Sequence, residues 1–208
     1  MEKISKNKLK EVSKLLMNKE RNKQQLFLVH DLKMINKAKQ LGLLKEAYET
    51  SNGVIGVIKF LPHKTLGKKI IYLDEISDPS NLGKIIYLMK KHKIKDLMLS
   101  PNSVSIYNEK CLDVCKENIF DINLSYGDIN TLRKLKEDYQ IVATGLKSTN
   151  YLDKLKLKKK FVLIFGNESC GVNLDILKLA HEVVKIDIKN IDSLNVAVAA
   201  SIIFAHLI

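Results

Sequence analysis

The chain has 208 residues, of which 46% are hydrophobic, so it can bury a substantial core in one large domain or two smaller ones. Its formal net charge of +12 suits a polyanion such as nucleic acid, although nearly all its cations are lysines, as a biased genome composition would also give. Three cysteines at 111, 115 and 170 form no metal-ligand spacing. We therefore expect reduced thiols, a cytoplasmic protein, no metal and no membrane span.

The first part of the chain is predicted to alternate helices and strands. Apolar residues at helical spacing among N-terminal lysines indicate a basic amphipathic helix. A strand is expected over Gln24–Val29, a helix over Leu32–Leu41 and a strand over Gly53–Ile58. Pro62 and Gly67 then interrupt a lysine-rich connection. We place a domain boundary there, which gives domains 1–65 and 66–208.

The second part shows a regular alternation of strands and helices. The expected strands are 70–73, 96–99, 119–124, 140–146, 161–165 and 183–188, and the expected helices begin at about 82, 104 and 128. Such alternation predicts an α/β fold with a mostly parallel sheet covered on both faces. The C-terminal helix, capped by Asp192 or Ser193, has apolar residues on every side and is expected to be buried.

Two polar loops each follow a buried strand and precede a helix. The first is GNESCG at 166–171 and the second is NIDSLN at 190–195. Open α/β sheets bind ligands at such positions, although ordinary strand-to-helix turns and helix caps have the same composition. The first loop lacks the Gly-Lys-Ser/Thr ending of a phosphate-binding loop, which makes a nucleotide hydrolase a poor alternative.

Three strings along the chain resemble the motifs of one family. LDEISDPSNLG (73–83), LIFGNESCG (163–171) and DSLNVAVAA (192–200) occur in the order, and on the elements, of the SpoU/TrmH-type RNA ribose methyltransferases. The segment RNKQQLFLV (21–29) resembles the start of the small ribosomal-protein-like domain that many members carry. The resemblance implies a C-terminal trefoil knot that holds S-adenosylmethionine, a homodimer formed through that domain, and a preceding small α/β RNA-binding domain.

The resemblance also implies roles for individual residues. The polar active-site positions correspond to Asn81, Tyr87, Glu168, Ser193 and Asn195. The positions that contact the methyl donor correspond to Thr144, Gly166, Asn167, Glu168, Ile186, Ile188 and Leu194. Methyl transfer to a ribose hydroxyl requires two oriented reactants and a place for one proton, which polar side chains at strand ends and helix starts can provide. Helix capping is the alternative role for Ser193 and Asn195.

The chain departs from the family at several of these positions. Tyr87 stands where the family has an arginine, and it is predicted to lie opposite the apolar stripe of its helix, beside Lys84 and Lys91. Cys115, Glu117 and Asp187 replace serine, glycine and proline. An RNA-binding protein of the same fold with weak or lost catalysis is therefore the alternative to an active enzyme.

We expect 2′-O-methylation of ribose in a structured RNA, with ribosomal RNA favoured over transfer RNA by the added N-terminal domain. RNA contacts are predicted at basic side chains of both domains, namely Lys8, Lys10, Arg21, Lys23 and Lys84. A basic RNA-binding module that never used the cofactor would also fit the charge. It would leave the paired loops unexplained.

Overall fold

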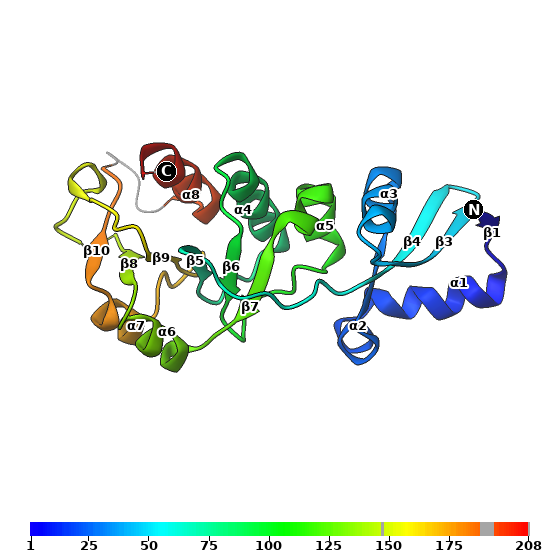
Figure 1. The fold of residues 1–208 in the computed structure, drawn as a ribbon, viewed down its shortest axis with the longest axis horizontal. Helices are drawn as coiled ribbons and strands as arrows, with labels where there is room; N and C mark the ends of the chain where they lie inside the picture. Colours follow the sequence, from blue (N-terminus) through cyan, green and yellow to red (C-terminus); the bar gives the residue numbers. More distant parts are fainter. Residues whose placement is uncertain (147, 188–193, 208) are drawn as a thin grey trace.

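The computed structural model describes residues 1–146, 148–187 and 194–207. Two sheets lie toward opposite ends of an elongated molecule (Figure 1). The first sheet draws its strands from residues 2–59 and the second from residues 69–184. The extended segment 60–68 joins them, and the division into domains 1–65 and 66–208 remains our proposal. Within the described part of the chain, no helix is long and apolar enough to cross a membrane.

The smaller sheet has the order β1-β3-β4-β2. Its strands are β1 (Glu2–Lys3), β2 (Leu26–Val29), β3 (Leu44–Thr50) and β4 (Gly53–Lys59). The helices around it are α1 (Lys6–Ser13), the 3₁₀ turn η1 (Lys14–Leu16), α2 (Asn18–Gln24) and α3 (Leu32–Gln40). The sequence did not predict β3, which pairs antiparallel with β4. Only Tyr48 in β3 is fully buried, so the strand lacks the apolar run that identifies its partner.

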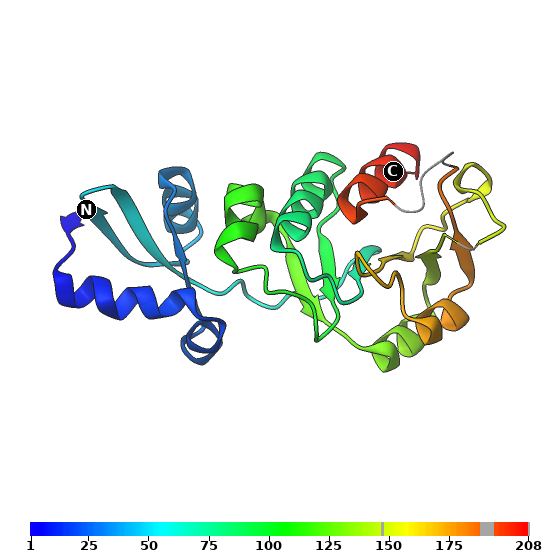
Figure 2. The ribbon, with the colours of Figure 1, turned by 180° about the vertical axis from the view of Figure 1, so that it is seen from behind.

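The larger sheet is parallel throughout and has the order β10-β8-β9-β5-β6-β7. Its strands are β5 (Lys69–Leu73), β6 (Asp96–Leu99), β7 (Asn123–Tyr126), β8 (Gln140–Thr144), β9 (Phe161–Phe165) and β10 (Glu182–Val184). Helices α4 (Pro79–Lys91), α5 (Glu109–Cys115) and α8 (Val196–Leu207) cover one face, and α6 (Ile129–Leu135) and α7 (Leu174–Leu179) cover the other (Figures 1 and 2). The mostly parallel α/β fold is therefore confirmed.

The strand order decides where the polar loops meet. The chain steps from β5 to β6 and β7 in one direction, then returns to build β8, β9 and β10 on the other side of β5. The order thus reverses between β9 and β5, which is where open α/β sheets form a ligand crevice at the carboxyl ends of the strands. The loop at 166–171 leaves β9 at this point.

Several predicted boundaries are wrong for local reasons. Helix α4 begins at Pro79, three residues before Leu82, because the Asp78 side chain accepts the backbone N–H of Ser80 at 2.8 Å. The helix expected from Val104 begins only at Glu109, where Asn108 caps it. The strand expected from Ile119 begins at Asn123, because residues 116–121 form the 3₁₀ segment η2 (Lys116–Asp121).

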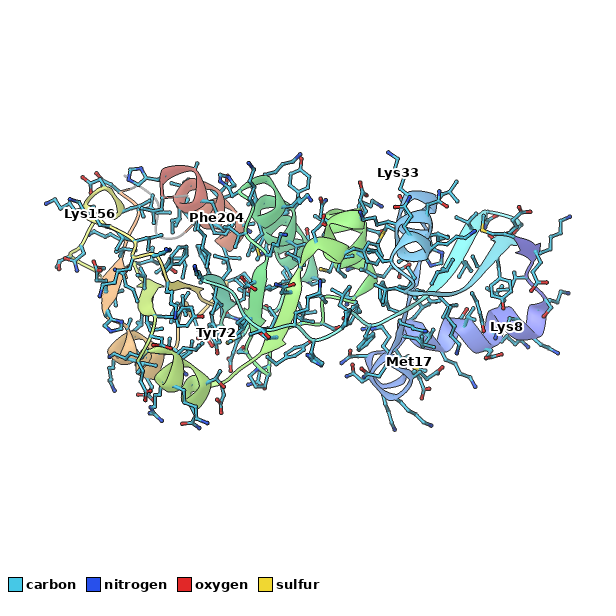
Figure 3. The ribbon with its side chains drawn as sticks, viewed as in Figure 1. Lys8, Met17, Lys33, Tyr72, Lys156 and Phe204 are labelled. Atoms are coloured by element: carbon cyan, nitrogen blue, oxygen red, sulfur yellow. The ribbon has the colours of Figure 1, made fainter. Side chains whose placement is uncertain are left out.

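The C-terminal helix is only partly buried in the single chain. Ala200, Ile203 and Phe204 of α8 are buried, but Val198 and Ile202 are 46% and 38% exposed. Figure 3 shows Phe204 and Tyr72 inside the larger part, whereas Lys33 and Lys156 project from the surface. The predicted knot would include residues 188–193, which lie outside the described residues, so the knot stays a prediction.

Aromatic rings join the two parts of the molecule. The ring of Tyr107, in the loop before α5, stacks on Phe60 at 3.8 Å and on Phe27 of β2 at 4.7 Å between centroids. Its hydroxyl accepts the backbone N–H of Leu61 at 2.9 Å. One hydrophobic core runs continuously from β2 and α3 into the larger sheet. The part of the chain that carries the small sheet is thus packed against the loop before α5 and is not tethered by the linker alone.

Candidate functional site

A hydrogen-bonded network joins three segments that are far apart in the sequence. The side-chain amide of Asn81, in the first turn of α4, donates to Glu168 Oε1 at 3.1 Å. Its carbonyl oxygen accepts from Asn195 Nδ2 at 3.0 Å. Asn81 is only 2% exposed. The start of α4, the loop after β9 and the start of α8 are therefore held together by one buried amide.

Glu168 accepts further hydrogen bonds from the turn that precedes α4. Ser77 donates its N–H and its hydroxyl to Oε2 at 3.3 and 3.1 Å, and the Asp78 N–H donates to Oε1 at 3.3 Å. Partial burial acts to raise the pKa of Glu168, but the hydrogen bonds from Asn81, Ser77 and Asp78 outweigh it, so the pKa is lowered. An ionised carboxylate with both oxygens occupied is a weak proton acceptor. The geometry gives Glu168 an anchoring role.

Asn195 caps α8, which is the alternative role that the sequence left open, and it also joins the network. Its side-chain oxygen accepts the Ala197 N–H at 2.9 Å, which caps α8, while its amide donates to Asn81. Ser193, the other residue expected there, lies outside the described residues, as does Ile188. Of the expected catalytic set, the structure brings Asn81, Glu168 and Asn195 together.

The loop at 166–171 closes on itself through Asn167. Asn167 and Gly171 exchange two backbone hydrogen bonds of 3.0 and 2.9 Å, and the Asn167 side chain accepts the N–H groups of Ser169 and Cys170. A Cβ atom at Gly166 would lie 2.1 Å from the backbone of Gly171 and Val172. Only glycine allows this approach.

Adjacent strand ends provide the surroundings expected for the methyl donor. Thr144 ends β8, Gly166 follows β9, and Ile186 follows β10, and these strands are neighbours in the sheet. Thr144 donates its hydroxyl to the Ile164 carbonyl at 3.1 Å. Leu194 and Ile186 are half-buried, and Leu146 is 58% exposed. Small, uncharged and apolar residues gathered at neighbouring strand ends suit an adenosyl group, so the residues present are compatible with S-adenosylmethionine.

Tyr87 does not join the network. It lies six residues after Asn81, which turns it to another side of α4, and its ring lies 5.1 Å from Lys91 Nζ. It lines a hollow of about 630 Å³ between α3, α4 and the end of α5, together with Lys33 and Lys116. The predicted pairing of Tyr87 with Lys91 on one face is confirmed, but within one chain the structure does not bring it to the other candidate catalytic residues.

The predicted RNA contacts differ in exposure. Lys10, Lys23 and Lys84 are exposed, and Lys8 is held by ion pairs of 3.1 Å to Glu11 and Glu46. Arg21 as an RNA contact is wrong. It is 5% exposed, and its guanidinium donates to the carbonyls of Leu15 and Leu16, so it stabilises the turn between η1 and α2.

The turn 74–78 also belongs to the site, although its residues were not predicted there. Glu75 has a positive φ of 53°, and its carbonyl accepts from Asn167 Nδ2 at 2.7 Å. Asp74 is buried and accepts the Asn173 N–H at 2.8 Å, and its burial raises its pKa. These residues belong to the same string, 73–83, that contains Asn81. Their placement beside a motif residue was the available signal.

Comparison with known proteins identifies the family. The model of the SpoU rRNA methylase family matches residues 68–205. The chain belongs to the SpoU rRNA methylase family. A curated relative, the 23S rRNA (guanosine(2553)-2′-O)-methyltransferase RlmP of Bacillus subtilis, is 24% identical and aligns over 100% of this chain and 98% of its own length. An uncharacterized tRNA/rRNA methyltransferase of Mycoplasma genitalium is 35% identical over 64% of this chain and 58% of its own.

Solved structures share this fold. The AdoMet-bound rRNA methyltransferase of Sinorhizobium meliloti superposes with a TM-score of 0.88 at 20% identity, covering 99% of this chain and 96% of that one. The SpoU methyltransferase AviRb of Streptomyces viridochromogenes, in complex with AdoMet, gives 0.85 at 16% identity, with 95% of each chain covered. The predicted family is confirmed, and with it the expectation of a methyltransferase.

Proposed function

We propose that this SpoU family member transfers a methyl group from S-adenosylmethionine to a ribose 2′-hydroxyl of ribosomal RNA. The observation that carries the proposal is the Asn195–Asn81–Glu168 network, because it fixes the starts of α4 and α8 against the loop of β9 at the reversal of strand order. The relative RlmP, which aligns over the full chain, is named for 2′-O-methylation of a guanosine in 23S rRNA and supports the choice of ribose and RNA.

The chain's own residues would mainly hold and orient the reactants. Thr144, Gly166, Asn167, Ile186 and Leu194 would hold the cofactor, which supplies an activated methyl group when bound. Glu168 and Asn81 hold the loop after β9 against the start of α4, and this fixed arrangement would help to orient the ribose hydroxyl toward the methyl group. Ser193, near the start of α8, is the proposed polar contact of the reacting oxygen.

Single-turnover transfer of labelled methyl to total RNA from cells that lack the protein tests this function. We expect label in ribosomal RNA at an alkali-resistant dinucleotide, since a 2′-O-methyl group removes the nucleophile of alkaline cleavage. A map of 2′-O-methyl sites in cells with and without the protein should show one site lost. Label in a base, or no binding of S-adenosylmethionine at millimolar concentration, would overturn the proposal.

A further inference from the structure

A second hollow lies between the two parts of the molecule, on the side of α2. It has a volume of about 340 Å³, which is within the range of small-ligand pockets. Its polar lining comes from α2 and its cap, the linker, the loop between β6 and α5, and the end of β7, and it includes Asn22, Gln25, His63, Ser103, Ser105 and Tyr126. Neither a carboxylate nor a lysine lines it. The hollow is thus a neutral, hydrogen-bonding site within a strongly basic chain.

The hollow opens at the same edge of the sheet as the candidate active site. Tyr126 ends β7, and the loop with Ser103 follows β6, so both lie at carboxyl ends of parallel strands. Hydrogen bonds connect the two places. Ser103 Oγ lies 3.0 Å from Ser100 Oγ, which accepts the Glu75 N–H at 2.7 Å, and the Glu75 carbonyl accepts from Asn167 at 2.7 Å.

The separation of the two places can be estimated from the sheet. From β9, which carries the Gly166 loop, to β7 there are three strand steps through β5 and β6. At about 4.8 Å per step, this is roughly 14 Å. Stacked nucleotides rise about 3.4 Å each along one strand, so the hollow lies a few nucleotides from the methylated one.

The lining matches the chemistry of a nucleobase. The Tyr126 side chain is 50% exposed, so its ring can stack on a base. The Asn22 amide and the His63 ring make no hydrogen bond within the described part of the chain, and amides and hydroxyls can read the donor and acceptor edge of an unpaired base. Gln25 is held in a left-handed conformation, φ 55°, with its side chain donating to the Asn22 carbonyl at 2.8 Å. This shapes the wall.

We propose that this hollow binds one unpaired nucleotide of the RNA substrate, a few nucleotides from the methylated ribose, and so selects the target sequence. The inference rests on the proposed function, since it takes the methylated RNA as the occupant. Tyr126 stacks on the base, Asn22 and His63 read its edge, and the exposed lysines at 23 and 64 lie next to them in the chain and contact the flanking phosphates.

Binding of short RNAs to the full chain tests the proposal. Four labelled heptanucleotides, U₇, A₇, C₇ and a G-containing heptamer, are titrated by anisotropy against the wild type, Tyr126→Ala, Tyr126→Phe and Asn22→Ala. Tyr126→Ala should weaken the preferred heptamer by about 5- to 150-fold, while Tyr126→Phe retains most of its affinity. Asn22→Ala should reduce the discrimination among the heptamers while leaving the salt dependence unchanged.

Matched controls are Leu41→Ala, which removes an exposed apolar side chain at the end of α3, and Asn52→Ala, which removes an exposed amide in the β3–β4 turn. Both should bind all four heptamers as the wild type does. A 4-thiouridine heptamer should crosslink to the peptide that contains Tyr126.

Equal binding of every heptamer by wild type and Tyr126→Ala, with no such crosslink, would overturn the inference. This failure differs from failure of the proposed function, which is read from cofactor titration and methyl transfer. Selective, Tyr126-dependent binding without transfer would support the nucleotide site and count against the reaction. Methyl transfer that proceeds equally well in the wild type and in Tyr126→Ala would support the reaction and count against the nucleotide site.

Discussion

Replacing Asn81 by aspartate tests the network most directly, because it changes one donor into an acceptor at nearly constant shape. The variant keeps an oxygen facing Asn195 Nδ2 but places a second oxygen 3.1 Å from Glu168 Oε1. Two unit charges at this separation repel by about 1.3 kcal/mol at the dielectric constant of water and by about 5 kcal/mol at an effective value of 20. Since Asn81 is buried, we expect a loss between these limits.

The sign of the pH dependence follows from the pair. Repulsion raises the pKa of one carboxyl in the folded variant above the ordinary value of about 4 that a carboxyl has in the unfolded chain. Between these two pKa values, the folded variant binds more protons than the unfolded chain. The stability of Asn81→Asp relative to the wild type is therefore regained as the pH falls and lost as it rises. In the wild type Glu168 acts oppositely, since its lowered pKa gives stability that is present above about pH 4.5 and lost in acid.

Urea unfolding of both proteins at pH 5 and pH 8 measures this difference. We expect the variant's deficit to be at least about 1 kcal/mol larger at pH 8. Asn102→Asp is the matched control, because Asn102 donates to Glu75 Oε1 at 2.8 Å in an exposed pair, where solvent screening should hold the change below about 1 kcal/mol. Equal deficits at both pH values, or a control that behaves like the variant, would refute the assigned network.

Four further outcomes are expected. Gly166→Leu should abolish binding of S-adenosylmethionine in calorimetry, because a Cβ there meets backbone at 2.1 Å, and wild-type affinity in the variant would contradict the loop assignment. Light scattering at micromolar concentration should show a dimer that Ile202→Glu converts to a monomer, because Val198 and Ile202 of α8 are exposed in the single chain. A monomeric wild type would contradict the proposed dimer. The logarithm of RNA affinity should fall with the logarithm of salt concentration, with a slope of roughly −0.7 per phosphate contacted on single strands, and the slope should be less steep in Lys10→Ala and Lys23→Ala. Arg21→Ala should leave the slope unchanged and lower the melting temperature, because Arg21 is buried. Tyr87→Arg should raise the rate of single-turnover methyl transfer and Lys84→Ala should lower it, because one hydrogen-bond donor to the transition state changes the rate on the order of 100-fold. Fast wild-type turnover with no gain in Tyr87→Arg would contradict this prediction.

The sequence predicted the parallel sheet well because its strands are apolar runs between loops. Strand β6 was predicted at its observed bounds, and β9 likewise, since both are buried along their whole length. Strand β3 was not predicted because charged residues occupy its exposed positions and leave no apolar run. Its strand structure depends on antiparallel pairing with β4.

For individual site residues, the sequence likewise does not reveal the hydrogen-bond partners or the burial of the side chain. Asn81, Glu168 and Asn195 were predicted as one site from motif resemblance, but nothing in the sequence tells that Glu168 holds Ser77 and Asp78. Arg21 was expected at the RNA because basic side chains of both domains were expected to contact its phosphates. Its burial depends on carbonyls at the end of η1 that only the folded turn brings within reach.

The position of Tyr87 changes what the missing arginine means. Six helical residues separate it from Asn81, about 9 Å along the axis and some 240° around it, so the Asn81–Glu168–Asn195 network is complete without any side chain at position 87. A guanidinium there would add a cation to a hollow lined by two lysines and two carboxylates, where it would act on an RNA phosphate, or it would act on the site of a second copy. The absence of arginine therefore bears on substrate and partner, while the part of the site that one chain builds by itself is retained. For this reason Tyr87→Arg should be measured in the Ile202→Glu background as well. A gain confined to the dimer would locate the effect in the neighbouring chain, and a gain in both would locate it at the RNA.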